Sequence, residues 1–269
     1  MITNNLLKTV TLPYKTVQGS FELRQQKAEQ FTHKFVNNIS GKIFDNGMSL
    51  SQLGRAVKAF VPKNIKVFIK KNNDVDSIAQ LNRTFTKNNW IVNQSLEMVP
   101  NKNKKIDVSH LPTIAHEIRH LADSLYHPKI LSREQKLAKA NLDTDKFYNF
   151  YDNEIYVTEI EGGKNLNKLI MKDIKHKTEK VLRGYSTRDK INMLQYMRYS
   201  LISEYNAYKD EYKLAKKLYK KNQPVFEDVL EDQTKGYMFN EKIKLLKSMI
   251  QELITKERGI HKSCIKNNK

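Results

Sequence analysis

Cysteine is nearly absent from this chain of 269 residues, because Cys264, close to the C-terminal end, is the only one. A single thiol cannot form a disulfide within the chain, and cysteine-rich zinc sites need several thiolates. The disulfide frameworks of small secreted domains are therefore excluded, and a reducing compartment is the expected location. Any metal site would have to be built from histidine and carboxylate ligands.

Long hydrophobic runs are missing as well. No stretch approaches the roughly 20 apolar residues that a membrane-spanning helix requires. Residues 1–8 contain no apolar core of the length found in secretory signals. We therefore expect a cytoplasmic protein without a membrane span, and delivery by a signal-less route or packaging into a virion stay open as alternatives.

Acidic residues are few beside the basic ones: 29 Asp and Glu stand against 48 Lys and Arg, for a net charge of +19. Such an excess attracts polyanions without regard to sequence. Lysine greatly exceeds arginine, however, whereas recognition of phosphates and bases favours the planar fork of arginine. The composition thus predicts nonspecific attraction to nucleic acids at low salt rather than a specific nucleic-acid-binding domain.

The most informative segment that is present is His116-Glu117-Ile118-Arg119-His120. Residues four apart on a helix lie on the same face, so the imidazoles of His116 and His120 can bind one Zn²⁺ from the same side. A glutamate next to the first histidine can act as general base toward a metal-activated water. The segment therefore predicts a zinc site with Glu117 as its catalytic base.

The residues around this segment predict a helix. Residues 108–112 contain a helix start, with Ser109 as a candidate N-cap and Pro112 in the first turn, where its missing N–H does no harm. Apolar residues then recur at helical spacing and indicate a buried stripe: Leu111, Ile114, Ile118, Leu121, Ala122 and Leu125. Asp123 falls on the neighbouring face with the two histidines. It could orient a ligand imidazole as a hydrogen-bond acceptor, or it could be an ordinary solvated carboxylate.

Residues 113–122 resemble the active-site helix of the zincin metallopeptidases. Arg119 departs from that family, where the residues around the ligands are usually uncharged, and we expect its long side chain to carry the charge outward. The metzincin subclass is rejected, because Asp123 and Tyr126 stand where it needs a glycine and a histidine. The resemblance implies a zinc-dependent peptidase that hydrolyses peptide bonds in a protein or peptide substrate.

A third protein ligand is expected, since catalytic zinc usually has three. Glu204 is the preferred candidate, because it borders the apolar stripe of a helix predicted over about residues 186–220, and a buried carboxylate needs a partner or a metal. A glutamate from a second, downstream helix resembles the gluzincin arrangement. Glu154 and Glu159 are the alternatives. Several tyrosines could donate a hydrogen bond to the developing oxyanion, and the sequence selects none of them.

The rest of the chain predicts a mostly helical α+β fold of zincin-like type. Residues 1–130 would form a mixed lobe with helices over 21–39 and 49–60, strands over 65–70 and 90–99, and the HExxH helix. Residues 95–99 are interpreted as an edge strand that could accept an extended peptide, with an interior strand as the alternative. Residues 131–269 would form a helical lobe, with helices over 132–140, 165–183, 186–220 and 241–256, that supplies the third ligand.

The sequence also allows a non-catalytic interpretation. The chain could be a basic binding or structural protein, for nucleic acid or as a virion component, in which the HExxH segment is decayed or accidental. A zinc-dependent peptidase is the preferred hypothesis.

Overall fold

The computed structural model describes residues 20–62, 67–71, 79–84, 93–127, 144–156 and 164–267. The helix predicted over residues 132–140 and the alternative ligand Glu159 lie outside these ranges.

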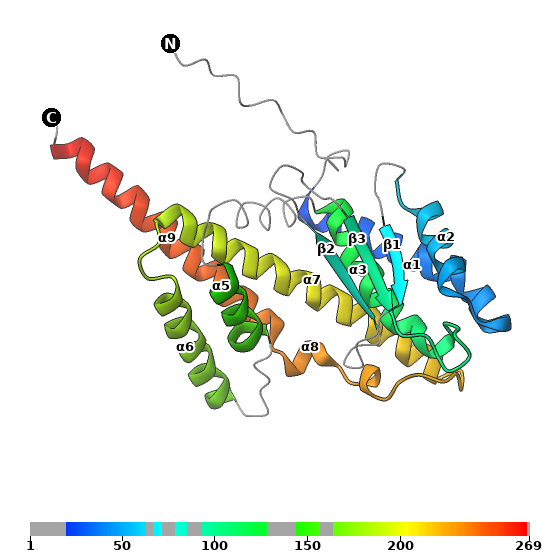
Figure 1. Cartoon of the computed structure of the whole chain (residues 1–269). Helices are drawn as coiled ribbons and strands as arrows, with labels where there is room; N and C mark the ends of the chain where they lie inside the picture. Colours follow the sequence, from blue (N-terminus) through cyan, green and yellow to red (C-terminus); the bar gives the residue numbers. More distant parts are fainter. Residues whose placement is uncertain are drawn as a thin grey trace, which may run out of the picture.

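Within the described residues the protein is mostly helical and carries one small sheet, as predicted for the α+β class (Figure 1). The elements in chain order are α1 (Phe21–Asn46), α2 (Leu50–Phe60), β1 (Val67–Lys71), β2 (Ala79–Thr84), β3 (Asn93–Met98), a 3-10 turn (Val108–His110), α3 (Leu111–Tyr126), α5 (Thr144–Phe150), a π-helical segment (Tyr151–Tyr156), α6 (Lys164–Val181), α7 (Thr187–Tyr219), a second 3-10 turn (Asp228–Leu230), α8 (Gln233–Gly236) and α9 (Phe239–Asn267). None of the described helices combines the length and apolarity that crossing a bilayer requires.

The sheet has the order β1-β3-β2, with β3 parallel to β1 and antiparallel to β2. β3 is therefore the interior strand: Leu96 is paired with Ile69 on one side and with Leu81 on the other. Of the two interpretations of residues 95–99, the interior strand is confirmed and the edge strand is wrong. The reason is β2, whose sequence Ala-Gln-Leu-Asn-Arg-Thr lacks a clear strand pattern and which occupies the edge that β3 would otherwise expose.

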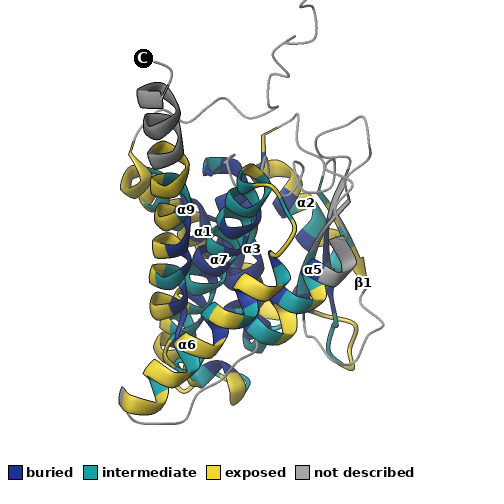
Figure 2. Ribbon diagram, turned by 90° about the vertical axis from the view of Figure 1, so that its left-hand side faces the viewer, coloured by how far each residue is buried: buried dark blue, intermediate teal, exposed yellow. Residues whose placement is uncertain are grey.

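The buried apolar side chains form two clusters. In the ribbon coloured by burial, α3 and α7 lie in the interior, and much of α6 is exposed (Figure 2). The first cluster lies between α1, α2, the sheet and α3, and the second cluster lies among α5, the π-helical segment, α6, α7 and α9. α7 takes part in both, since Leu218 near its end belongs to the first cluster and Leu194 and Leu201 belong to the second. This long helix packs directly against α3 and α9, and so brings the second half of the chain onto the HExxH helix.

The predicted N-cap of α3, Ser109, is not the observed one: the N-cap position is held by His110, which makes no side-chain capping hydrogen bond. Asp107 rather than Ser109 caps the preceding 3-10 turn: its carboxylate accepts the backbone N–H of Ser109 at 3.1 Å, and the side chain of His110 accepts the Asp107 N–H. Pro112 lies in the first turn of α3, as expected. The predicted stripe from Leu111 to Leu125 is buried in the first cluster, which leaves the face with the histidines turned toward α7.

Candidate metal centre

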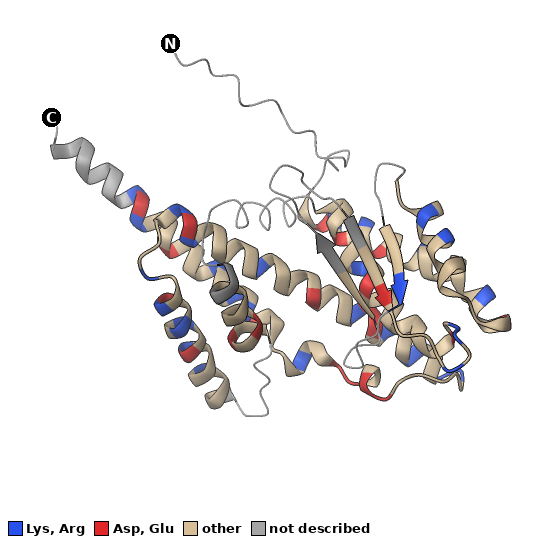
Figure 3. Cartoon of the chain, viewed as in Figure 1, with Lys and Arg blue, Asp and Glu red and all other residues tan. Residues whose placement is uncertain are grey.

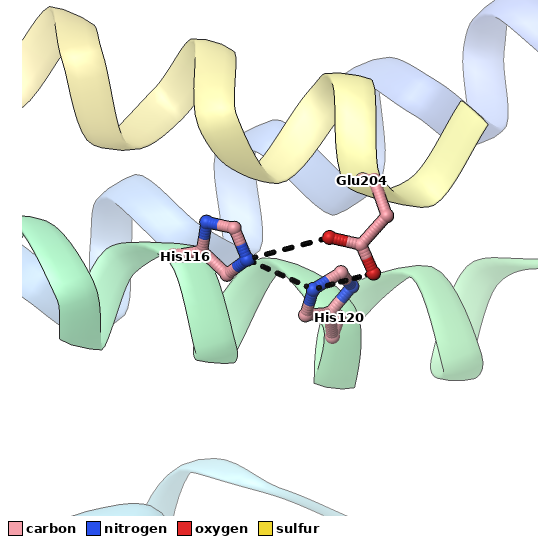
Figure 4. A group of neighbouring side chains, drawn as sticks. All are labelled: His116, His120 and Glu204. Atoms are coloured by element: carbon pink, nitrogen blue, oxygen red, sulfur yellow. Dashed lines mark hydrogen bonds and ion pairs between the residues drawn. The ribbon is translucent and has the colours of Figure 1, made fainter. Parts of the chain in front are cut away.

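His116 and His120 on α3 face Glu204 on α7 (Figure 4). The Nε2 atoms of the two histidines are 3.1 Å apart. The Glu204 carboxylate lies 3.6 Å from Nε2 of His116 through Oε2, and 3.4 Å from Nε2 of His120 through Oε1. The structure thus brings together the three residues that the sequence nominated as ligands.

These distances fit a single zinc ion. Two ligand atoms at about 2.0–2.1 Å from a tetrahedral Zn²⁺ are about 3.3 Å apart, and the 3.1 Å between the two imidazole nitrogens is close to that value. Each imidazole nitrogen has a different oxygen of the Glu204 carboxylate at 3.4 to 3.6 Å, so that either oxygen is close to the position of the ion. Two imidazole nitrogens and one carboxylate are also a usual donor set for catalytic zinc, with a further position left for water or substrate. The side chains of His116 and His120 are about nine-tenths buried and a quarter of the Glu204 side chain is exposed, so Glu204 is the most exposed member of the group.

Each histidine also makes a hydrogen bond through its Nδ1 atom, the ring nitrogen that does not face Glu204. Nδ1 of His116 lies 2.9 Å from Oε2 of Glu211, and Nδ1 of His120 lies 3.0 Å from the hydroxyl of Ser203. That hydroxyl in turn lies 3.0 Å from Oδ2 of Asp123. The Ser203 hydroxyl therefore connects Asp123 to His120.

Sequence reasoning missed Glu211 and Ser203. Glu211 is seven residues, two helical turns, after Glu204, so it lies on the same face of α7. That spacing was the available signal. Ser203 precedes Glu204, and serine is too common on helices for its position alone to suggest a role.

The charges of the group are strongly coupled. Burial raises the pKa of Glu117, the charges of Glu204 and Glu211 raise it further, and the nearby histidines only partly oppose this. Burial would also raise the pKa of Glu204, but the two histidines hold it well below its usual value. For His116, burial favours the neutral form, yet Glu211 and Glu204 raise its pKa well above the ordinary value. The carboxylates around the histidines thus create a site that favours a cation.

Arg119 does not carry its charge outward, contrary to the expectation. Its side chain is 4% exposed, and its guanidinium lies between α3 and α7. Nε donates to Asp123 at 3.0 Å, Nη1 to Asp210 at 2.7 Å, and Nη2 to the side-chain oxygen of Gln25 on α1. Three helices supply acceptors for this one cation, which is why it is stable in the interior.

Of the two alternative ligands, only Glu154 lies within the described residues, and it is not part of this group. Glu154 is 40% exposed and pairs with Lys177 at 2.7 Å, outside the group formed by the histidines and Glu204. A second grouping of possible ligands consists of Glu29, His33 and Asp210. Its two carboxylates are already bound by cations: Glu29 by Lys213 at 3.1 Å and Asp210 by Arg119. We interpret this second grouping as an ion-pair network.

Two tyrosines border the centre. The ring of Tyr208, one helical turn after Glu204, packs against the ring of His116 with centroids 4.6 Å apart. Its hydroxyl is hydrogen-bonded at 2.9 Å to that of Tyr156 in the π-helical segment. Burial and the charge of Glu204 raise the pKa of both hydroxyls, so both are protonated donors at neutral pH.

No protein-family model, curated protein or solved structure matches this chain. Its function therefore has to be inferred from the site.

Proposed function

We propose that the protein is a zinc-dependent peptidase of zincin type. The observation that carries this proposal is the convergence of Nε2 of His116, Nε2 of His120 and the Glu204 carboxylate at separations of 3.1 to 3.6 Å, with the buried Glu117 next to His116. A helix whose histidines merely flanked the core would not need a carboxylate from another helix aimed at both imidazoles.

Each residue has a distinct role in this reaction. His116, His120 and Glu204 would hold the ion. Zinc, when bound, lowers the pKa of water and polarises a carbonyl oxygen. Glu117 takes a proton from the attacking water and passes it to the departing amine as the peptide C–N bond breaks. Burial raises the pKa of Glu117, which makes its carboxylate a stronger base than an exposed glutamate.

The proposed substrate is a protein or peptide in the cytoplasm, and we propose an edge of the sheet as the surface that binds it. β2 and β1 are the edge strands among the described residues, and β2 packs against α3. An extended peptide could pair with an edge strand by main-chain hydrogen bonds. Because β3 is in the interior, we propose β2 in place of residues 95–99 as the edge strand that pairs with the peptide.

The non-catalytic alternative is favoured by one observation, the net charge of +19. Lysines and arginines are scattered over the helices, while acidic residues occur where α3 and α7 meet (Figure 3). This distribution fits nonspecific attraction to polyanions. It does not explain why carboxylates converge on the two histidines.

The deciding experiment measures zinc per chain and peptide hydrolysis for the wild-type protein, His116→Ala and Glu117→Gln. We expect about one zinc in the wild type and none in His116→Ala. Glu117→Gln should keep its zinc while the hydrolysis of a mixed peptide library falls by about 10²–10⁴-fold, the usual contribution of a general base. No zinc in the reconstituted wild type, or unchanged hydrolysis by Glu117→Gln, would overturn the proposal.

A further inference from the structure

We propose that Ser203 is a positioning residue that fixes which nitrogen of His120 faces the metal. Its hydroxyl links His120 to the Arg119–Asp123 ion pair through two hydrogen bonds. The inference rests on the proposed metal site and adds to it a residue that does not touch the ion.

The argument begins with hydrogen counting at Ser203. A serine hydroxyl has one hydrogen to donate, whereas an ionised carboxylate can only accept. The Ser203 hydroxyl lies 3.0 Å from Oδ2 of Asp123 and must donate there. At its second contact, 3.0 Å from Nδ1 of His120, it can only accept. Nδ1 of His120 must therefore carry the hydrogen, which makes Nε2 the nitrogen available to a metal.

The direction of these hydrogen bonds depends on Asp123 being an anion. The positive charge of Arg119 beside it favours that ionised form. Nε of Arg119 donates at 3.0 Å to Oδ1 of Asp123, the oxygen that Ser203 does not use. The guanidinium is itself fixed by Asp210 and Gln25. The charged residue that departs from the zincin pattern thus anchors the acceptor at the far end of the link.

The two histidines are consequently held in different ways. His116 donates directly to a carboxylate, that of Glu211, at 2.9 Å. His120 donates to a neutral hydroxyl, and the carboxylate behind it is shared with a buried cation. Ser203 therefore acts on His120 mainly by fixing the orientation and the tautomer of its imidazole ring. Because Ser203 adjoins Glu204, the same turn of α7 supplies both the third ligand and this link.

The first test compares Ser203→Ala with two matched variants. Ser203→Thr keeps the hydroxyl. Ser124→Ala also removes a buried hydroxyl beside His120, but that hydroxyl bonds to the backbone oxygen of His120 at 2.9 Å and not to the ring. Partners behind a metal-bound histidine commonly contribute 10- to 100-fold to metal affinity. We expect Ser203→Ala to lower the zinc affinity by about that factor, measured by competition with a chelator, and the other two to stay close to wild type.

A double-mutant cycle then tests whether Ser203 and Asp123 act in series. An asparagine at position 123 can donate as well as accept, so Asp123→Asn should weaken zinc binding in the wild-type background. In the Ser203→Ala background the same change should cost no further zinc affinity. Denaturant unfolding of each zinc-free variant serves as the readout for a merely structural effect, which would lower stability without this pattern in affinity.

The outcomes separate this inference from the proposed function. A wild-type protein that binds no zinc would overturn both. A wild-type protein that binds zinc, together with Ser203→Ala of equal affinity, would overturn the role of Ser203 and leave the metal site standing. Independent losses that add in the double mutant would also contradict the link.

Discussion

At the scale of single residues, two of the three glutamates considered as third ligand, Glu204 and Glu154, have opposite surroundings. Glu204 faces both Nε2 atoms, whereas Glu154 is paired with Lys177 at the surface. We predict that Glu204→Gln lowers the zinc content sharply, because an amide is a weak zinc ligand, and that Glu154→Gln keeps the full wild-type content. Metal analysis of the two purified variants decides. A full complement of zinc in Glu204→Gln would remove Glu204 from the ligand set.

The tyrosine pair carries a second prediction at this scale. Tyr208 packs on His116 and shares one hydrogen bond with Tyr156, so the pair uses only one of its two hydroxyl hydrogens, and the other can be donated to a developing oxyanion. We expect Tyr156→Phe or Tyr208→Phe to lower kcat by about 10²–10³-fold with zinc retained, the usual cost of losing one such donor. Tyr212→Phe, one turn further along α7, is the control. Full kcat in both variants of the pair would exclude them as donors.

The three candidate ligands could be predicted from the sequence, but most of the residues that contact them could not. The spacing of His116 and His120 and the position of Glu204 beside an apolar stripe are local features of one helix each. The burial of Arg119 was not predictable in this way, because it depends on Asp210 and Gln25, which other helices bring to it. A charged side chain is usually exposed to solvent, and it is buried only where oppositely charged or polar partners surround it.

At the scale of elements, α3 and α7 are joined by buried charge as well as by apolar packing. Arg119 on α3 binds Asp123 on its own helix and Asp210 on α7, and all three side chains are at most 4% exposed. Removing one member of such a network leaves uncompensated buried charge. We predict that Arg119→Met lowers the free energy of unfolding by about 3–5 kcal/mol, measured by urea denaturation of the zinc-free protein.

The control for this prediction is Lys177→Met. Lys177 pairs with Glu154 and Asp173, but all three side chains are at least 40% exposed, so solvent screens the pairs and little stability should be lost. A loss in Arg119→Met no larger than that in Lys177→Met would mean that the buried network contributes nothing to holding α3 on α7.

Helices were easier to predict than strands. α7 (Thr187–Tyr219) agrees closely with the expected range of 186–220, because its periodicity and its N-cap Ser186 lie within the segment itself. The position of β3 between two strands depends on β2, and β2 has no strong strand pattern of its own. Strand order is a property of pairing between distant segments, so a single strand's sequence does not reveal it.

At the scale of the whole molecule, an acidic centre lies within a basic protein. Carboxylates of Glu117, Glu204 and Glu211 surround the histidines, while the chain as a whole carries a net charge of +19. The two features have different ranges. The coupling at the centre acts over a few ångströms in a buried environment, whereas the surface charge acts at long range and is screened by salt.

The different response of surface charge and buried centre to salt distinguishes the peptidase hypothesis from the hypothesis of a basic binding protein. We predict that double-stranded DNA binds the wild type, His116→Ala and Glu117→Gln equally at low salt, because the substitutions leave the surface lysines unchanged. That affinity should fall steeply as salt rises from about 50 to 200 mM, as counterion release requires. Zinc content and peptide hydrolysis of the wild type should need no polyanion and should survive the same salt. Salt-resistant DNA binding that is lost in His116→Ala, without hydrolysis in the wild type, would instead make the zinc centre a structural part of a nucleic-acid-binding protein.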